Sequence, residues 1–287
     1  MTERKRVVLT GAAGTIAGLL LPALRERYEL TLLDIRKTDP DGEVIEDVQI
    51  ADLLADDRDA YRHHFRGVDA VVHCGFTRAD DPDDPQQRFA AELANVQMAY
   101  NVYRTAWEEE VRRVVVASSN HAADYYEPLI LDHDWDLVTP EMRALSDNYY
   151  GWAKEVYEHL GFVFAVGKMN GRPLENVQIR IGGPRETDVA NCPKGDLRCV
   201  RRALAVYISQ RDMAQLFIKS IETQDIRDEH GVPFQIFYGI SENPHAFWSI
   251  VNAREVIGYA PRDNSELRFN ELIREHIRAA KTDDESV

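Results

Sequence analysis

The sequence has few cysteines and no long hydrophobic run. Its 287 residues include three cysteines, Cys74, Cys192 and Cys199, too few for the disulfide framework of a small secreted protein. Cys192 and Cys199 stand in a polar stretch without a nearby pair of histidines, so no metal site is predicted. We therefore expect free thiols. No apolar run approaches the roughly 20 residues that a membrane span needs.

Basic residues are also scarce relative to acidic ones. The chain has 34 Lys and Arg against 49 Asp and Glu, a formal net charge of −15. Nucleic acids and anionic membranes bind basic surfaces, so neither is an expected partner. A signal peptide would remove the first predicted strand, which starts a few residues after Met1. The sequence therefore predicts a cytoplasmic protein.

Apolar runs and helical patterns alternate along the chain. Runs rich in β-branched residues predict strands at 7–9, 30–33, 48–50, 70–74, 114–117, 174–181 and 234–238. Helical spacing predicts helices at about 19–28, 58–65, 86–110, 149–168, 211–222 and 250–257, with a loop at 120–148 and a polar segment at 185–202. This alternation is typical of a Rossmann-like, doubly wound α/β sheet. We predict a nucleotide-binding core at 1–184 and, at 185–287, a small C-terminal substrate cap that does not fold independently.

The first strand and helix are joined by a glycine turn. Gly11 permits a tight turn, and Gly14 lets backbone N–H groups approach a pyrophosphate at the positive end of the helix. The second strand ends in Asp34, about 20 residues after the turn, where a carboxylate reads a ribose 2′-hydroxyl. This layout predicts a dinucleotide site that prefers NAD to NADP, because Asp34 repels a 2′-phosphate.

Three further residues suit proton removal from an alcohol. Ser119 follows a predicted strand, at the sheet edge where ligands bind in such folds. Tyr150 and Lys154 are four residues apart, which places them on one helix face. An ammonium group beside a phenol favours the phenolate and so makes it a better base. We expect this set to remove a hydroxyl proton while a hydride leaves the same carbon.

With these residues the chain resembles the extended short-chain dehydrogenase/reductases, and the resemblance extends from about Val7 to Asn264. The shared markers are Thr10, Gly11, Ala12, Ala13, Gly14, Ala17, Asp52, Leu53, Asn95, Ser119, Tyr150 and Lys154. Within that group the chain is similar to uronate dehydrogenases and to archaeal-type NAD-dependent glucose-6-phosphate dehydrogenases. The markers of this closer similarity are the stretches 117–121, 180–182, 238–243 and 258–265, with Arg202, Ser209 and Asp212.

The resemblance implies an NAD-dependent enzyme that oxidises C1 of an acidic aldose, a hexose 6-phosphate or hexuronate, to the aldonolactone. It implies Ser119, Tyr150 and Lys154 as the catalytic set. The cofactor-binding residues that it implies are Gly11, Ala13, Gly14, Thr15, Ile16, Asp34, Asp52, Leu53, Asn95, Tyr150, Lys154 and Ile181. The sugar would contact Ser119, Asn120, His121, Gly183 and Arg202. A homo-oligomer without a metal is also implied.

Arg202 would hold the acidic group, because a guanidinium can donate two parallel hydrogen bonds to a carboxylate or phosphate. Two features depart from the family pattern. Uronate dehydrogenases have a serine where this chain has Gly183, and the segment 186–201 is longer and more basic than in those enzymes. The added positive charge favours phosphate.

Two other functions share the same cofactor domain. A sugar-nucleotide epimerase or dehydratase usually has a longer C-terminal part than the residues after Arg185, and Val-Tyr-Gly where this chain has Asn120, His121 and Ala122. A non-catalytic NAD-binding sensor would not require a phenol base such as Tyr150.

Overall fold

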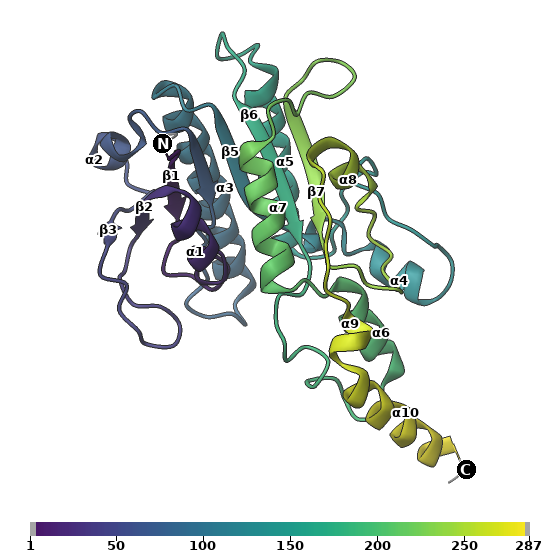
Figure 1. Ribbon diagram of the computed structural model, residues 1–287. Helices are drawn as coiled ribbons and strands as arrows, with labels where there is room; N and C mark the ends of the chain where they lie inside the picture. Colours follow the sequence, from purple (N-terminus) through teal and green to yellow (C-terminus); the bar gives the residue numbers. More distant parts are fainter. Residues whose placement is uncertain (1–3, 285–287) are drawn as a thin grey trace.

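The computed structural model describes residues 4–284 (Figure 1). Residues 1–3, which belong to the N-terminal stretch behind the cytoplasmic prediction, lie outside the described residues, as do 285–287. Within the described part, no helix is long and apolar enough to cross a membrane.

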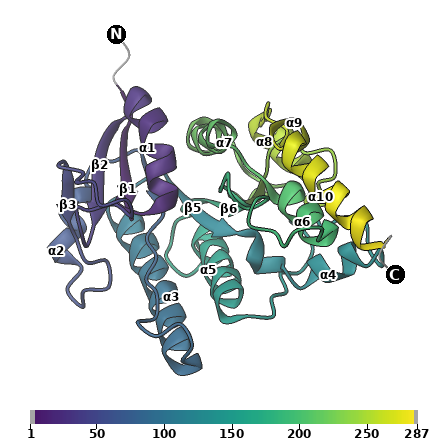
Figure 2. The ribbon, with the colours of Figure 1, turned by 90° about the horizontal axis from the view of Figure 1, so that it is seen from below.

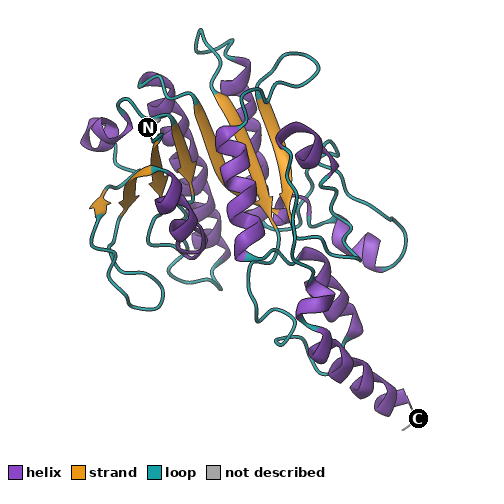
Figure 3. Cartoon of the chain, viewed as in Figure 1, coloured by secondary structure: helices purple, strands orange, loops and turns teal. Residues whose placement is uncertain are grey.

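A seven-stranded parallel sheet forms the centre of the fold (Figure 3). Its order is β3-β2-β1-β4-β5-β6-β7. The strands are β1 (Arg6–Thr10), β2 (Glu29–Asp34), β3 (Val48–Ile50), β4 (Ala70–His73), β5 (Arg113–Ser119), β6 (Glu175–Ile181) and β7 (Phe234–Gly239). The order reverses between β1 and β4, and ligands bind at such a switch point. The predicted Rossmann-like fold is confirmed.

Helices cover both faces of the sheet, as Figure 2 shows. On one face lie α1 (Thr15–Arg27), α7 (Gln210–Glu222) and α8 (Val251–Ile257), and on the other α2 (Asp59–Arg62), α3 (Pro85–Glu108) and α5 (Tyr149–Val166). Side chains alternate between the two cores: Val7 and Leu9 belong to the first and Val8 to the second. Runs such as those at 7–9 and 114–116 are therefore apolar on both faces, which is why they were recognisable as continuous runs.

A third, smaller core lies beyond the carboxyl ends of β6 and β7 (Figure 1). It is formed around α6 (Leu197–Val206), α9 (Ser265–Arg268) and α10 (Asn270–Asp284), with Val189, Tyr207 and Phe269 buried in it. The division at residue 184 stays a prediction. Part of the chain after it, β7 and α7, joins the main sheet and its cover.

Several helices were not predicted. The expected loop at 120–148 contains a 3₁₀ turn at Asn120–Ala123 and α4 (Tyr126–Leu131), and the polar segment at 185–202 includes the start of α6. The α6 sequence is amphipathic, because Val200, Ala203 and Leu204 are buried while its arginines lie on the other side. The Asp196 side chain caps this helix by accepting from the Cys199 amide.

Candidate active site

The glycine turn between β1 and α1 has the form that a dinucleotide requires. Gly11 has φ +65°, and a Cβ there would stand 2.6 Å from backbone atoms of Cys74 and Gly75. The Gly14 amide donates to the Gly11 carbonyl at 2.9 Å, and α1 begins at Thr15 without a side-chain cap. The first amides of α1, including those of Thr15 and Ile16, therefore suit an anionic pyrophosphate.

Asp34 lies beside this turn at the end of β2. Its Oδ2 accepts from the Ala13 amide at 3.0 Å, and its Oδ1 from the Arg36 amide at 3.2 Å. The carboxylate is half-buried and next to the glycine turn. This geometry fits recognition of a ribose hydroxyl.

The other predicted cofactor residues border the same edge of the sheet. Asp52 is exposed after β3, and Leu53 is buried, with its carbonyl accepting from Asn101 at 2.8 Å. Asn95, on α3, bonds both the amide and the carbonyl of Thr77 and so fastens the loop after β4. Ile181 is buried at the end of β6.

Ser119 and Tyr150 come from neighbouring elements. Ser119 is the last residue of β5, opposite Ile181 in β6, and its Oγ accepts from the His121 amide at 3.2 Å. Tyr150 is in the first turn of α5, capped by the Asn148 side chain accepting from the Gly151 amide at 3.0 Å. A Cβ at Gly151 would lie 2.0 Å from the His121 carbonyl oxygen, so only glycine allows this approach. It brings the Tyr150 and His121 rings to 5.7 Å between centroids.

Lys154 is buried one helical turn after Tyr150. Its Nζ donates to the Ala117 carbonyl at 3.0 Å and lies 5.2 Å from the centroid of the Tyr150 ring. The ammonium thus sits between β5 and the phenol, as a residue that stabilises a phenolate must. Among the described residues, the Tyr150 hydroxyl has no hydrogen-bond partner, so its oxygen is available to a substrate.

The residues predicted to contact the sugar form two hydrogen-bonded groups. His121 Nδ1 bonds Asp124 Oδ2 at 2.8 Å, and Asn148 Nδ2 donates to the same oxygen at 2.8 Å. Burial alone would raise the pKa of the Asp124 carboxyl, but the hydrogen bonds from His121, Ser146 and Asn148 outweigh it and lower that pKa. Asp124 therefore stays ionised and orients the His121 ring.

The second group joins Asn120 to Arg202 through Glu127. Glu127 Oε1 accepts from Asn120 Nδ2 at 2.9 Å and from Arg202 Nη2 at 3.3 Å, and Oε2 accepts from Arg202 Nε at 2.9 Å. Burial lowers the pKa of Arg202, but Glu127 outweighs it and raises that pKa. Sequence reasoning missed Glu127, because it lies 75 residues from Arg202 on the unpredicted helix α4.

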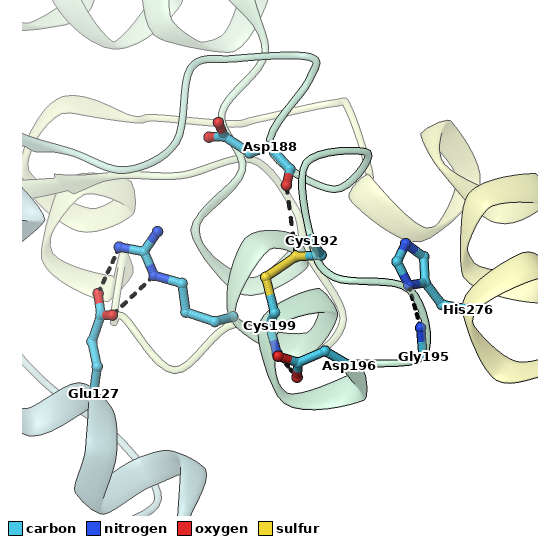
Figure 4. The surroundings of a disulfide bond; sticks show 8 residues. Glu127, Asp188, Cys192, Gly195, Asp196, Cys199 and His276 are labelled. Carbon is cyan, nitrogen blue, oxygen red and sulfur yellow. Dashed lines mark hydrogen bonds and ion pairs between the residues drawn. A yellow bond between two sulfur atoms is a disulfide. The ribbon is translucent and has the colours of Figure 1, made fainter. Parts of the chain in front are cut away.

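The prediction of three free thiols was wrong for two of them. Cys192 and Cys199 form a disulfide with their Cα atoms 5.7 Å apart, in surroundings that include Glu127 (Figure 4). The chain reverses at Gly195, where φ is +84°, and enters α6, which returns Cys199 to Cys192. A single short bridge needs no disulfide framework, so the low cysteine count did not exclude it. Cys74 is a free thiol.

A buried ion pair behind the site was also missed. Glu158 on α5 accepts from Arg180 on β6, with Arg180 Nη2 at 2.8 Å, and from the Ser118 hydroxyl at 2.6 Å. Arg180 Nη1 donates to the Tyr238 hydroxyl at 2.8 Å. This network ties the helix of Tyr150 and Lys154 to the strand of Ser119. The sequence analysis included Arg180 only within the stretch 180–182, and its partner could not be told from Glu155, the other glutamate of α5.

Comparisons with known proteins identify the family. The model of the family described as "NAD dependent epimerase/dehydratase family" matches residues 7–164. The chain belongs to this family. The predicted resemblance is thereby confirmed, and with it the expectation that the fold is that of an NAD-dependent family. In the described residues no group of His, Cys, Asp or Glu is arranged to hold a metal ion.

Three relatives are each 30% identical to the chain. They are a uronate dehydrogenase of Pseudomonas syringae (93% of this chain, 85% of the relative), an NAD-dependent glucose-6-phosphate dehydrogenase of Haloferax volcanii (90% and 94%) and an L-arabinose 1-dehydrogenase (NAD(P)(+)) of the same organism (91% and 97%). A crystal structure of glucuronic acid dehydrogenase from Chromohalobacter salexigens is 25% identical and matches with a TM-score of 0.73, over 95% of this chain and 90% of that one.

Proposed function

We propose that this protein is an NAD-dependent sugar dehydrogenase that oxidises C1 of an aldose to the aldonolactone. The observation that carries the proposal is the placement of Tyr150, Lys154 and Ser119 at the carboxyl edge of a sheet whose first turn suits a dinucleotide. The relatives' names include two acidic sugars and one neutral sugar, and aldose oxidation is what they have in common. The acidic aldose expected from the sequence depends on Arg202 as the anchor.

The residues that would hold NAD are those around the glycine turn. The amides from Ala13 to Ile16 would bind the pyrophosphate, and Asp34 would accept from the ribose hydroxyls of the adenosine half. Asp52, Leu53, Asn95 and Ile181 would line the rest of the site, and Lys154 would reach the nicotinamide ribose. When bound, NAD supplies the hydride acceptor.

The chain's own residues manage the proton. Ser119 Oγ would hold the C1 oxygen of the sugar, and Tyr150 would take the hydroxyl proton onto its phenolate oxygen. Lys154, fixed on the Ala117 carbonyl, provides the positive charge that favours this phenolate. Asn120 and His121 would orient the ring through its other hydroxyls.

The test is formation of NADH with a panel of aldoses, comparing Tyr150→Phe with Tyr149→Phe. Tyr149 is the neighbouring, exposed tyrosine and packs on Phe89, so it is a matched control. We expect Tyr150→Phe to lower kcat by about a hundredfold or more while calorimetry still detects NAD binding, since only the base is lost. Tyr149→Phe should keep full activity.

Two results would contradict this proposal, the first its mechanism and the second its reaction. If Tyr150→Phe kept more than about a hundredth of the activity, another residue would be the base. If the protein converted a nucleotide sugar without net NADH, it would be the epimerase or dehydratase of the alternative interpretation.

A further inference from the structure

We propose that the sugar site of this protein selects an uncharged aldose. Glu127 already binds the guanidinium of Arg202, and Asp188 lies next to position 183, so an acidic group would meet a carboxylate at both places. This inference rests on the proposed C1 dehydrogenase function and names its substrate class. It replaces the acidic aldose that the sequence predicted with a neutral one.

The first observation is that the guanidinium of Arg202 already has a carboxylate partner. Glu127 takes both Nε and Nη2, the two-donor edge that binds a carboxylate in parallel. The two dashed lines that end on Glu127 in Figure 4 mark these bonds. Glu127 is itself fixed by Asn120, the residue after Ser119. An acidic sugar would have to displace Glu127 or bind beside its negative charge.

The second observation concerns the space beside Gly183. A Cβ at Gly183 would lie 2.9 Å from Asp188 Oδ2, so this carboxylate stands where a side chain at position 183 would begin. Gly183 follows the end of β6 by two residues, next to the strand end that pairs with Ser119. The Asp188 carboxylate accepts no hydrogen bond from any residue between 4 and 284. It can therefore accept a sugar hydroxyl, whereas it would repel a carboxylate or phosphate.

The charges around Arg202 point the same way. Glu127, Asp188 and Asp124 all act on this one guanidinium electrostatically, and Asp124 also holds His121. These three carboxylates add negative charge around Arg202 that an anionic group would meet. Carboxylate oxygens are strong acceptors with room for more than one donor, so they match the hydroxyl groups of a neutral sugar.

The experiment compares sugars that differ only at C6. Initial rates of NADH formation give kcat/KM for glucose, glucuronate and glucose 6-phosphate, and for galactose and galacturonate, while L-arabinose and xylose serve as neutral pentoses. We expect kcat/KM for the best neutral aldose to exceed that for its acidic partner by about tenfold or more, the factor that one charge-assisted hydrogen bond contributes.

Variants test whether the two carboxylates cause the preference. Glu127→Gln keeps the shape but frees Arg202 of its counter-charge, so the ratio of neutral to acidic kcat/KM should fall by about tenfold or more. Asp188→Asn should lower the same ratio. Asp132→Asn is the matched control. It removes a carboxylate at the end of α4 that binds Arg198 on α6 rather than Arg202. The ratio of neutral to acidic kcat/KM should not change in this variant.

Each outcome decides between the proposals. Preference of the unaltered protein for an acidic sugar over its neutral partner would overturn this inference and leave the dehydrogenase function standing. A ratio unchanged in both Glu127→Gln and Asp188→Asn, with NADH formation retained, would also overturn it. No NADH with any aldose would overturn the dehydrogenase function and this inference with it.

Discussion

The Glu158–Arg180 pair allows a sharp test of what holds the active-site helix to the sheet. Both side chains are almost fully buried, at 3% and 1% exposure, and Arg180 uses Nε, Nη2 and Nη1 on Glu158 and Tyr238. Burial lowers the pKa of Arg180, but the attraction of Glu158 prevails and raises that pKa. Replacing Glu158 with Gln keeps the volume of the side chain and removes its charge.

The cost follows from the charge that remains. A buried guanidinium without its counter-ion costs about 3–5 kcal/mol of unfolding free energy. A chain of 287 residues unfolds with an entropy on the order of 0.6 kcal/mol per kelvin, so the melting temperature should fall by about 5–8 °C. Glu158 binds Ser118, the residue before Ser119, and lies one helical turn after Lys154. The substitution Glu158→Gln should therefore disturb the positions of Ser119 and Lys154, and we expect a lower kcat for the molecules that remain folded.

The assay is thermal and urea unfolding followed by circular dichroism, with Asp47→Asn as the control. Asp47 also pairs with an arginine, Arg25, but it is 60% exposed, and its replacement should leave stability within error. The double variant Glu158→Leu with Arg180→Met removes both charges and should recover most of the loss. A loss below about 1 kcal/mol in Glu158→Gln, or a double variant as unstable as the two single losses together, would refute the reasoning.

Two further predictions concern stability. Replacing Cys192 and Cys199 with serine opens a loop of sequence separation 7 and should lower the free energy of unfolding by about 2.4 kcal/mol. A reductant should destabilise the unaltered protein by a similar free energy, measured by thermal unfolding, and leave the variant unchanged. Equal effects of the reductant on both proteins would contradict a structural disulfide. Burial, with a smaller contribution from Lys154, lowers the pKa of His73 to about 3. As the pH falls, the imidazole therefore binds a proton in the unfolded chain before it does so in the folded protein. The free energy of unfolding should then fall by about 1.4 kcal/mol per pH unit between the ordinary pKa of about 6.5 and pH 3. In His73→Asn, the free energy of unfolding should depend less steeply on pH between pH 6 and 4, by about the slope that one bound proton causes. Equal slopes in the variant and the unaltered protein would exclude a buried neutral histidine.

The local geometry of the candidate cofactor site was predictable because its signals lie close together in the sequence. Gly11, Gly14 and Asp34 lie within about one strand–helix–strand unit, where backbone geometry dictates residue type. Tyr150 and Lys154 are one helical turn apart, so their proximity follows from the helix itself. The structure adds the close approach of α5 to His121, two residues after Ser119, which Gly151 permits.

The cap was harder to predict because its stability depends on partners far away in the chain. The arginines of α6 look like a solvated loop, and its apolar residues Val200 and Leu204 acquire meaning only against Phe269 and α10. The disulfide was missed for a related reason. Spacing alone does not tell whether a chain turns back, and the reversal at Gly195 became visible only with the backbone.

The charge of the substrate is the point at which the match of residues to a family pattern and the contacts in the structure lead to different proposals. Arg202 has the identity and spacing of an anion-binding arginine, and the basic residues near it strengthen that expectation. A guanidinium, however, binds an acidic substrate only to the extent that no carboxylate of the protein is already bound to it. Glu127 comes from another helix, and Asp188 from a loop that folds back on Gly183, so both partners are set by the tertiary fold. Under the proposal of a neutral aldose, Arg202 would position the Glu127 carboxylate, which would accept hydroxyl groups of the sugar.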